Sequence, residues 1–136
     1  MLTELISGLW IGSIDDIYNE DYYNDNLITI VINCTVTHGF LDLPQLKKVR
    51  VPITSDLSPN QDIFLLKNNI EKILGFIHEN IEENNILIFC YDGLKISPLI
   101  VSLYILKYGG ISSDTIRDIL RSKNEKICLD IDLSIF

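Results

Sequence analysis

Two hydrophobic patterns alternate along this chain of 136 residues. Short runs that are almost entirely apolar and rich in β-branched residues predict strands buried on both faces, as in a parallel sheet. Longer segments in which apolar residues recur every three or four positions predict helices. The predicted strands lie at residues 5–6, 9–11, 28–34, 49–53 and 86–89. Strands that alternate with helices predict an α/β fold: a single domain, 1–136, with a central, mostly parallel sheet flanked by helices.

Helix signals fall between and after these strands. Ser13 is typical of the N-cap of a short helix that begins at Ile14. Isoleucines and leucines at three- and four-residue steps predict an amphipathic helix within residues 64–83. Residues 97–108 are apolar on most faces and predict a buried helix, and Ser113 is the predicted N-cap of a last helix.

Composition narrows the class of protein. A hydrophobic content of 47 % with 22 % charged residues predicts a globular domain. The net charge of −8 argues against nucleic acid and anionic membranes as partners. The densest basic group, Lys47, Lys48 and Arg50, is typical of a solvated strand edge. No apolar stretch is long enough to span a bilayer, and three irregularly spaced cysteines indicate reduced thiols and a cytoplasmic, intracellular protein. Abundant isoleucine and asparagine are typical of an AT-rich genome, such as that of a virus or a protist.

The most informative segment joins the last predicted strand to the buried helix. It begins at a cysteine, contains one glycine and ends with a serine at the start of the helix. A strand, a tight loop and a helix N-terminus in this order present backbone N–H groups that suit an anion. The segment consists of Phe89, Cys90, Tyr91, Asp92, Gly93, Leu94, Lys95, Ile96 and Ser97.

This loop resembles the signature of the cysteine-dependent phosphatases, which reads His-Cys, five residues, Arg and then Ser or Thr. Further segments resemble the dual-specificity phosphatases: residues 6–13 their first strand, 31–35 their Val-Leu-Asn-Cys strand, 51–53 their Val-Pro-Val strand and 97–107 the helix after the loop. The resemblance covers residues 5–125 and implies that family's fold. It also implies that Cys90 stands in the position of the nucleophile, where loop amides and a helix N-terminus lower the pKa of a thiol.

Several positions depart from the family's signature. Phe89 replaces the histidine that supports the loop, and Ile96 replaces the arginine that binds two phosphate oxygens. Losing such a charge clamp typically costs ~10³-fold or more in rate. Asp92 stands where the family has a small residue. A carboxylate that faces the phosphate cradle, the space enclosed by the loop after Cys90, would repel phosphate. Lys95 is the neighbouring cation that could substitute, but a lysine lacks the planar fork of an arginine.

The general acid and the serine each have two interpretations. The family's acid follows the Val-Pro-Val strand, where Ser55 is the direct match, Asp56 the best candidate and Asp62 a later one. The alternative for Asp56 is a solvated turn residue. Ser97 matches the hydroxyl that eases departure of the thiolate, and it also suits an N-cap before Pro98. His38 and His78 are far apart in different contexts, so no metal site is expected, and no cofactor is implied.

These departures favour a catalytically inactive dual-specificity phosphatase homologue, a pseudophosphatase that binds a protein partner as a scaffold or regulatory module. Loss of the arginine argues against capture of phosphorylated ligands, so phosphate binding is expected to be weak or absent. An acidic chain suits a basic partner segment, and self-association into a homo-oligomer is a further option. Two alternatives stay open: a weakly active, divergent phosphatase in which Lys95 assists Cys90, and a redox-reactive thiol protein.

Overall fold

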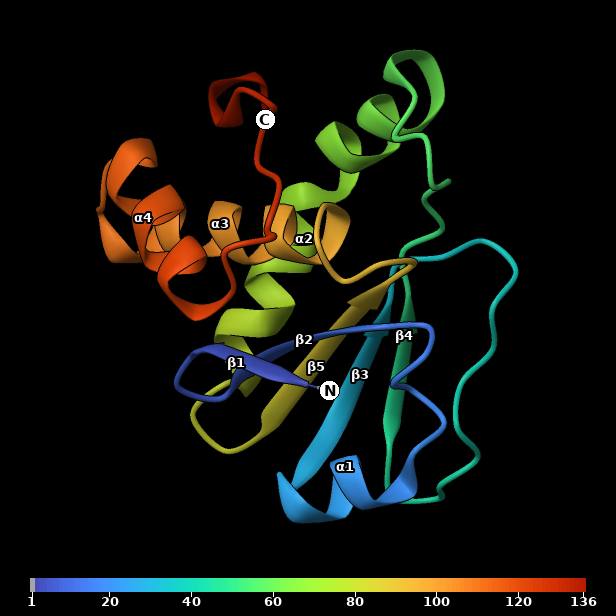
Figure 1. Cartoon of the computed structure of the whole chain (residues 1–136). Helices are drawn as coiled ribbons and strands as arrows, with labels where there is room; N and C mark the ends of the chain where they lie inside the picture. Colours follow the sequence, from blue (N-terminus) through green and yellow to red (C-terminus); the bar gives the residue numbers. More distant parts are fainter. Residues whose placement is uncertain (1) are drawn as a thin grey trace.

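The computed structural model describes residues 2–136, which contain one five-stranded sheet in the order β1-β2-β5-β3-β4 (Figure 1). The strands are β1 (Thr3–Ile6), β2 (Leu9–Ser13), β3 (Ile28–Asn33), β4 (Lys47–Arg50) and β5 (Asn85–Cys90). β2, β5, β3 and β4 run parallel, and β1 pairs antiparallel with β2. β5 comes last in the sequence but lies in the middle of the sheet, because crossover connections bring parallel strands to either side of it.

Within residues 2–136, four α-helices accompany the sheet: α1 (Glu20–Asp25), α2 (Phe64–Asn80), α3 (Ile96–Gly109) and α4 (Ser113–Lys123). A π-helical turn, Pro59–Ile63, leads into α2, and a 3-10 turn, Leu133–Ile135, lies near the end of the chain. Figure 1 shows α2, α3 and α4 gathered together, whereas α1 lies apart, at the end of the sheet where β3 begins. No helix within residues 2–136 is long and apolar enough to cross a lipid bilayer.

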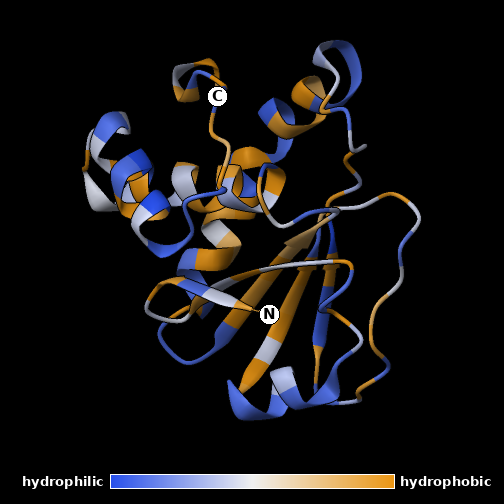
Figure 2. Ribbon diagram, viewed as in Figure 1, coloured by the Kyte–Doolittle hydropathy of each residue, from blue (hydrophilic) through white to orange (hydrophobic). Residues whose placement is uncertain are grey.

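The residues of β5 alternate between two hydrophobic cores. Ile86, Ile88 and Cys90 pack with residues of α2, α3 and α4 in the larger core. Leu87 and Phe89 belong to the smaller core on the opposite face. Burial on both faces explains why the interior strands are continuous apolar runs, which Figure 2 shows in the hydrophobic colour. Further members of the smaller core are Leu2, Ile17, Tyr23, Ile28, Val31, Leu43 and Leu46.

The predicted α/β fold class is confirmed, and a strand lies at or beside each predicted position. The strand predicted at 49–53 is shifted toward the N-terminus, because β4 spans Lys47–Arg50 and ends before Pro52. Its ladder continues for one more bond, in which Val51 N–H donates to the Asn33 carbonyl at 2.8 Å. The predicted domain, 1–136, begins at Met1, which lies outside the described residues.

Two predicted helix starts are wrong. No helix begins at Ile14: residues 14–18 form turns, and α1 begins at Glu20 with Asn19 as its N-cap. Ser13 ends β2, and its hydroxyl donates to the Asp16 carboxylate at 3.1 Å, a local side-chain bond that favours a turn over a helix. The N-cap of α4 is Ser112 rather than Ser113, because the Ser112 hydroxyl accepts the Thr115 N–H.

Replacing Phe89 with alanine tests how far the smaller core supports the central strand. Phe89 is fully buried and its ring lies edge-on to that of Phe40, with centroids 6.5 Å apart. We expect Phe89→Ala to lower the free energy of unfolding by about 3–5 kcal/mol, measured by urea denaturation, because it leaves a cavity. The matched control is Phe64→Ala, since Phe64 is 64 % exposed; its effect should stay within about 0.5 kcal/mol. Equal losses in the two variants would contradict the prediction.

Candidate functional site

The Cys90 loop, residues 91–95, connects the carboxyl end of β5 to the N-terminus of α3. Ligand-binding loops lie at this edge of parallel sheets, as the sequence predicts for this loop. Gly93 has φ +70°, and a Cβ added there would lie 3.0 Å from the backbone carbon of Gly12. Only glycine fits this close approach without strain, so Gly93 determines how tightly the loop folds back on β2.

Cys90 and Ser97 retain a direct contact. The Ser97 N–H donates to Cys90 Sγ at 3.3 Å, and the Ser97 hydroxyl lies 3.2 Å from the same sulfur. Both residues are fully buried. The Ser97 hydroxyl therefore lies where the family's hydroxyl would assist departure of the cysteine thiolate. Its predicted role as the N-cap is wrong, because α3 begins one residue earlier, at Ile96, and Lys95 occupies the cap position.

Asp92 is exposed, but its carboxylate turns back toward the cysteine at the start of the loop, a direction that the sequence left open. Its Oδ1 atom accepts the N–H of Leu94 at 2.9 Å and lies 3.8 Å from Cys90 Sγ, which donates to it. One carboxylate oxygen thus touches both the cysteine sulfur and a backbone amide of the cradle. The Asp92 carboxylate therefore occupies one backbone donor of the loop beside the cysteine sulfur.

Ile96 and Lys95 do not supply the missing cation. Ile96 is 2 % exposed and packs in the larger core, so its side chain offers no donor to the loop. Lys95 is exposed, and within residues 2–136 it donates no hydrogen bond and has no carboxylate at ion-pair distance. Its charge acts on a different thiol, that of Cys128. The hydrogen bond between Cys128 and Asp130 raises the pKa of that thiol, and Lys95 opposes the rise.

Tyr91 joins the Cys90 loop to two other loops. Its hydroxyl donates to the Ile53 carbonyl at 2.8 Å and accepts the Val36 N–H at 3.1 Å. The ring also lies edge-on to that of His38, with centroids 5.9 Å apart. The phenol therefore connects the segment after β5 with those after β3 and β4. Sequence reasoning missed this role, because no local pattern marks a tyrosine whose partners lie 38 and 55 positions away.

Arg50 organises the loop that follows β3. Its guanidinium donates to the carbonyls of Thr35, Val36 and His38 at 2.9, 3.2 and 2.8 Å. Arg50 is exposed on the edge strand β4, as the interpretation of this basic group as a solvated edge predicts, and its guanidinium in addition holds this loop. Because Val36 also donates to Tyr91, the arginine acts on the Cys90 loop through one intermediate residue.

The acid candidates separate clearly in the structure. Asp56 is exposed, and within residues 2–136 it takes part in no hydrogen bond or ion pair. Ser55, the direct match in sequence, is also exposed. Asp62 is fully buried, and its carboxylate accepts the N–H groups of Thr54 and Ser58, at 3.1 and 2.7 Å, and the Thr54 hydroxyl. Burial raises the pKa of Asp62, but the bonds from Thr54 and Ser58 outweigh it and the net pKa lies below the ordinary value. Asp62 thus holds the loop before α2 together.

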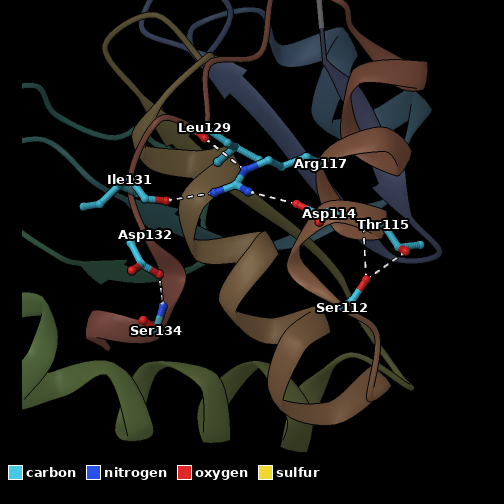
Figure 3. A network of polar contacts seen from close by, with 8 residues as sticks. All are labelled: Ser112, Asp114, Thr115, Arg117, Leu129, Ile131, Asp132 and Ser134. Atoms are coloured by element: carbon cyan, nitrogen blue, oxygen red, sulfur yellow. Dashed lines mark hydrogen bonds and ion pairs between the residues drawn. The ribbon is translucent and has the colours of Figure 1, made fainter.

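The C-terminal segment supports the far side of the Cys90 loop. The Cys128 N–H donates to the Leu94 carbonyl at 2.8 Å. Figure 3 shows how Arg117 of α4 holds the next residues: its guanidinium donates to the carbonyls of Leu129 and Ile131 and lies 3.5 Å from the Asp114 carboxylate. The segment therefore reaches the loop through backbone contacts and adds no charged side chain to the cradle.

The two histidines lie in aromatic contacts. His38 packs against Tyr91, and His78 stacks on Tyr108 with ring centroids 3.9 Å apart. Within the part of the chain that the structure describes, no three His, Cys, Asp or Glu side chains are grouped closely enough to hold a metal ion.

A central strand, a cysteine-entry loop and a helix N-terminus at the carboxyl edge of a parallel sheet make up the arrangement that oxyanion-binding α/β domains use. The family profile described as the dual specificity phosphatase catalytic domain matches residues 9–134. The chain therefore belongs to the dual-specificity phosphatase family, as the resemblance implied. Human dual specificity protein phosphatase 8 is 28 % identical over 122 residues, which cover 83 % of this chain but only 18 % of that protein.

Solved structures share the fold. A mouse putative dual specificity phosphatase complexed with zinc tungstate superposes with a TM-score of 0.84 at 17 % identity, over 98 % of this chain and 82 % of that one. Human tyrosine phosphatase-like serine/threonine/tyrosine-interacting protein gives 0.79 at 15 % identity, over 95 % and 87 %. At these identities the likeness concerns the fold alone.

Removing the Tyr91 hydroxyl tests its connection to the neighbouring loops. We expect Tyr91→Phe to lower the free energy of unfolding by about 1–3 kcal/mol in urea, because the Val36 N–H and the Ile53 carbonyl each lose a partner. Tyr18 is 55 % exposed, so Tyr18→Phe is the matched control and should leave stability unchanged. A Tyr91→Phe protein as stable as this control would show that the phenol does not join the loops.

Asp62 makes stability depend on pH in a defined direction. Its folded pKa is lowered, so its stabilising effect is complete above its ordinary pKa of 3.8 and is lost as the pH falls through the folded value. We expect Asp62→Asn to lower the free energy of unfolding by about 1–3 kcal/mol at pH 7. The gap to the parent protein should narrow in urea titrations below pH 4. Asp56→Asn, which makes the same charge change at an exposed position, should match the parent throughout; a constant gap for Asp62→Asn would refute the account.

Proposed function

We propose that this domain is a catalytically inactive dual-specificity phosphatase homologue, a pseudophosphatase that acts by binding a protein. The observation that carries the proposal is the Asp92 carboxylate inside the Cys90 loop, in contact with both Cys90 Sγ and the Leu94 N–H. A phosphoryl group needs that space and needs positive charge around it. Here the space holds a negative charge that belongs to the chain.

Two backbone donors of the cradle are already occupied, and its cation is missing. The N–H groups of Leu94 and Ser97 are both directed at internal acceptors, Asp92 and Cys90. Ile96 is buried in the core where the family's arginine would bind two oxygens. Loss of this charged transition-state contact typically costs ~10³-fold or more in rate, and repulsion by Asp92 acts in the same direction. Binding of phosphorylated ligands is disfavoured for the same reasons.

Proton transfer to a leaving group has no suitable donor either. Asp62 is committed to Thr54 and Ser58, and its pKa is lowered, which favours the ionised form. Asp56 lies exposed on the loop. The domain has lost the phosphate-binding arginine, an unobstructed anion-binding loop and a general acid together. For this reason we favour an inactive domain over a weakly active enzyme.

The two alternatives gain little support. For a divergent enzyme, Lys95 would have to assist Cys90, but Lys95 is exposed, and its side chain donates no hydrogen bond to the loop within residues 2–136. For a redox-reactive thiol, burial first and the neighbouring Cys90 second raise the pKa of Cys34 well above its usual range, and Cys90 is itself fully buried. Low-pKa, accessible thiols are the reactive ones.

A domain that keeps the phosphatase fold but lacks the groups for catalysis can still act by binding a protein. Among the structural neighbours, the human tyrosine phosphatase-like protein is named as an interacting protein, which fits such a role for this fold. The three free cysteines fit a reducing, intracellular setting.

The test is hydrolysis of p-nitrophenyl phosphate by the purified chain, with Cys90→Ser as the blank. We expect no turnover above the blank and, by calorimetry, no binding of tungstate. Cys90-dependent turnover would overturn the proposal. Asp92→Ala should gain measurable tungstate binding because it frees the Leu94 N–H and removes the repelling charge, whereas Asp56→Ala should not. If the parent protein binds tungstate as well as Asp92→Ala does, Asp92 does not fill the cradle.

A further inference from the structure

An open strand edge lies away from the Cys90 loop. β4 is the last strand of the sheet in the order β1-β2-β5-β3-β4 (Figure 1). The Val51 N–H bonds to the Asn33 carbonyl of β3, so by the alternation of strand geometry the backbone groups of Lys48 and Arg50 point outward. Outside the sheet ladder, none of the hydrogen bonds within residues 2–136 uses the backbone of these two residues. β4 therefore offers unpaired donors and acceptors to another strand.

A groove of about 210 Å³ runs beside this edge, between β4 and α2. Its apolar floor comes from strand and helix together, and one end is marked by a proline that ends the strand. An extended segment that pairs with β4 would place alternate side chains over this floor. The lining residues are Val49, Arg50, Val51, Pro52, Leu65, Asn69, Lys72 and Ile73.

The charge around the groove is opposite to that of the whole chain. Lys72 lines the groove and Lys47 stands at the start of β4, and neither has a carboxylate at ion-pair distance within the described residues, 2–136. The Arg50 guanidinium is engaged elsewhere, with carbonyls of the loop after β3. Lys47 instead lies 5.0 Å over the ring of Phe76. Glu71, next to Lys72 in the sequence, lines a different groove between α2 and α3. In a chain with 19 acidic and 11 basic residues, two lysines without an ion-pair partner beside one groove are a local concentration of positive charge.

We infer that the β4–α2 groove binds an extended, acidic segment of a partner protein, which adds a strand to the sheet at β4. Its backbone would pair with Lys48 and Arg50, its apolar side chains would cover Val49 and Val51, and its carboxylates would meet the two lysines beside the groove. A second copy of this chain does not fit, because pairing β4 with β4 would set like charges against each other. The negative net charge of the chain predicted a basic partner segment. The lysines beside this groove favour an acidic one.

The test uses a fluorescein-labelled peptide, Glu-Val-Glu-Val-Glu-Val-Glu, titrated with the full chain by fluorescence anisotropy. We expect saturable binding that weakens as salt is raised and is absent for the peptide with lysine in place of glutamate. The double variant Lys47→Glu with Lys72→Glu should bind about tenfold more weakly or worse. The matched control, Lys123→Glu with Lys126→Glu, makes the same charge change on exposed residues away from the groove and should stay within about twofold.

Strand addition has its own readout. Hydrogen exchange at the Lys48 and Arg50 amides should slow when the acidic peptide binds, and a peptide N-methylated at alternate residues should lose binding. The inference would be overturned if the N-methylated peptide bound equally well, or if the acidic peptide slowed exchange only at amides outside β4. It would also be overturned if both double variants lost the same affinity, or if the chain preferred a single-stranded oligonucleotide to the acidic peptide. Because the groove is separate from the Cys90 loop, phosphatase activity in the earlier assay would leave this result unaffected.

Discussion

Burial of β5 on both faces is the constraint on which the rest of this structure depends. The strand is paired on both sides by parallel neighbours, and its side chains alternate between the two cores. Cys90 therefore faces α2 and α3, and Phe89 faces the opposite layer. The position of the cysteine loop at the carboxyl edge follows from this arrangement, as does the entry angle of α3. Phe89 needs no partner for hydrogen bonding in its apolar layer, where a histidine would need one.

The loop after β5 has an architecture that suits an anion, but here side chains of the loop itself accept two of its N–H groups. Backbone N–H groups in a tight loop need acceptors whether or not a ligand is present. In this chain Asp92 and Cys90 provide acceptors for two of them, the N–H groups of Leu94 and Ser97. The proposed loss of catalysis is thus compatible with an intact fold, because the groups that stabilise the loop differ from those that would stabilise a transition state.

Two side chains connect loops around the site that are distant in sequence. Tyr91 joins the segments after β3, β4 and β5, and Arg50 holds the carbonyls of the β3 loop beside it. Arg50 also belongs to the basic edge at β4. The loop that covers the smaller core and the edge that we propose as a binding surface therefore share one residue.

The sequence by itself determined the fold class, the order of strands and helices along the chain and the position of the Cys90 loop, because burial on both faces imposes continuous apolar strands and helical periodicity marks the covering helices. It also identified Ile96 and Phe89 as departures, because residue types alone show the loss of charge and donors. It could not locate α1, since the Ser13–Asp16 bond favours turns at the predicted helix start. Only the tertiary structure decided that Asp92 faces the sulfur, that Asp62 is buried while Asp56 is exposed, and that Arg50 and Tyr91 hold loops together. These outcomes depend on side-chain direction and on partners tens of residues away, which local patterns do not encode.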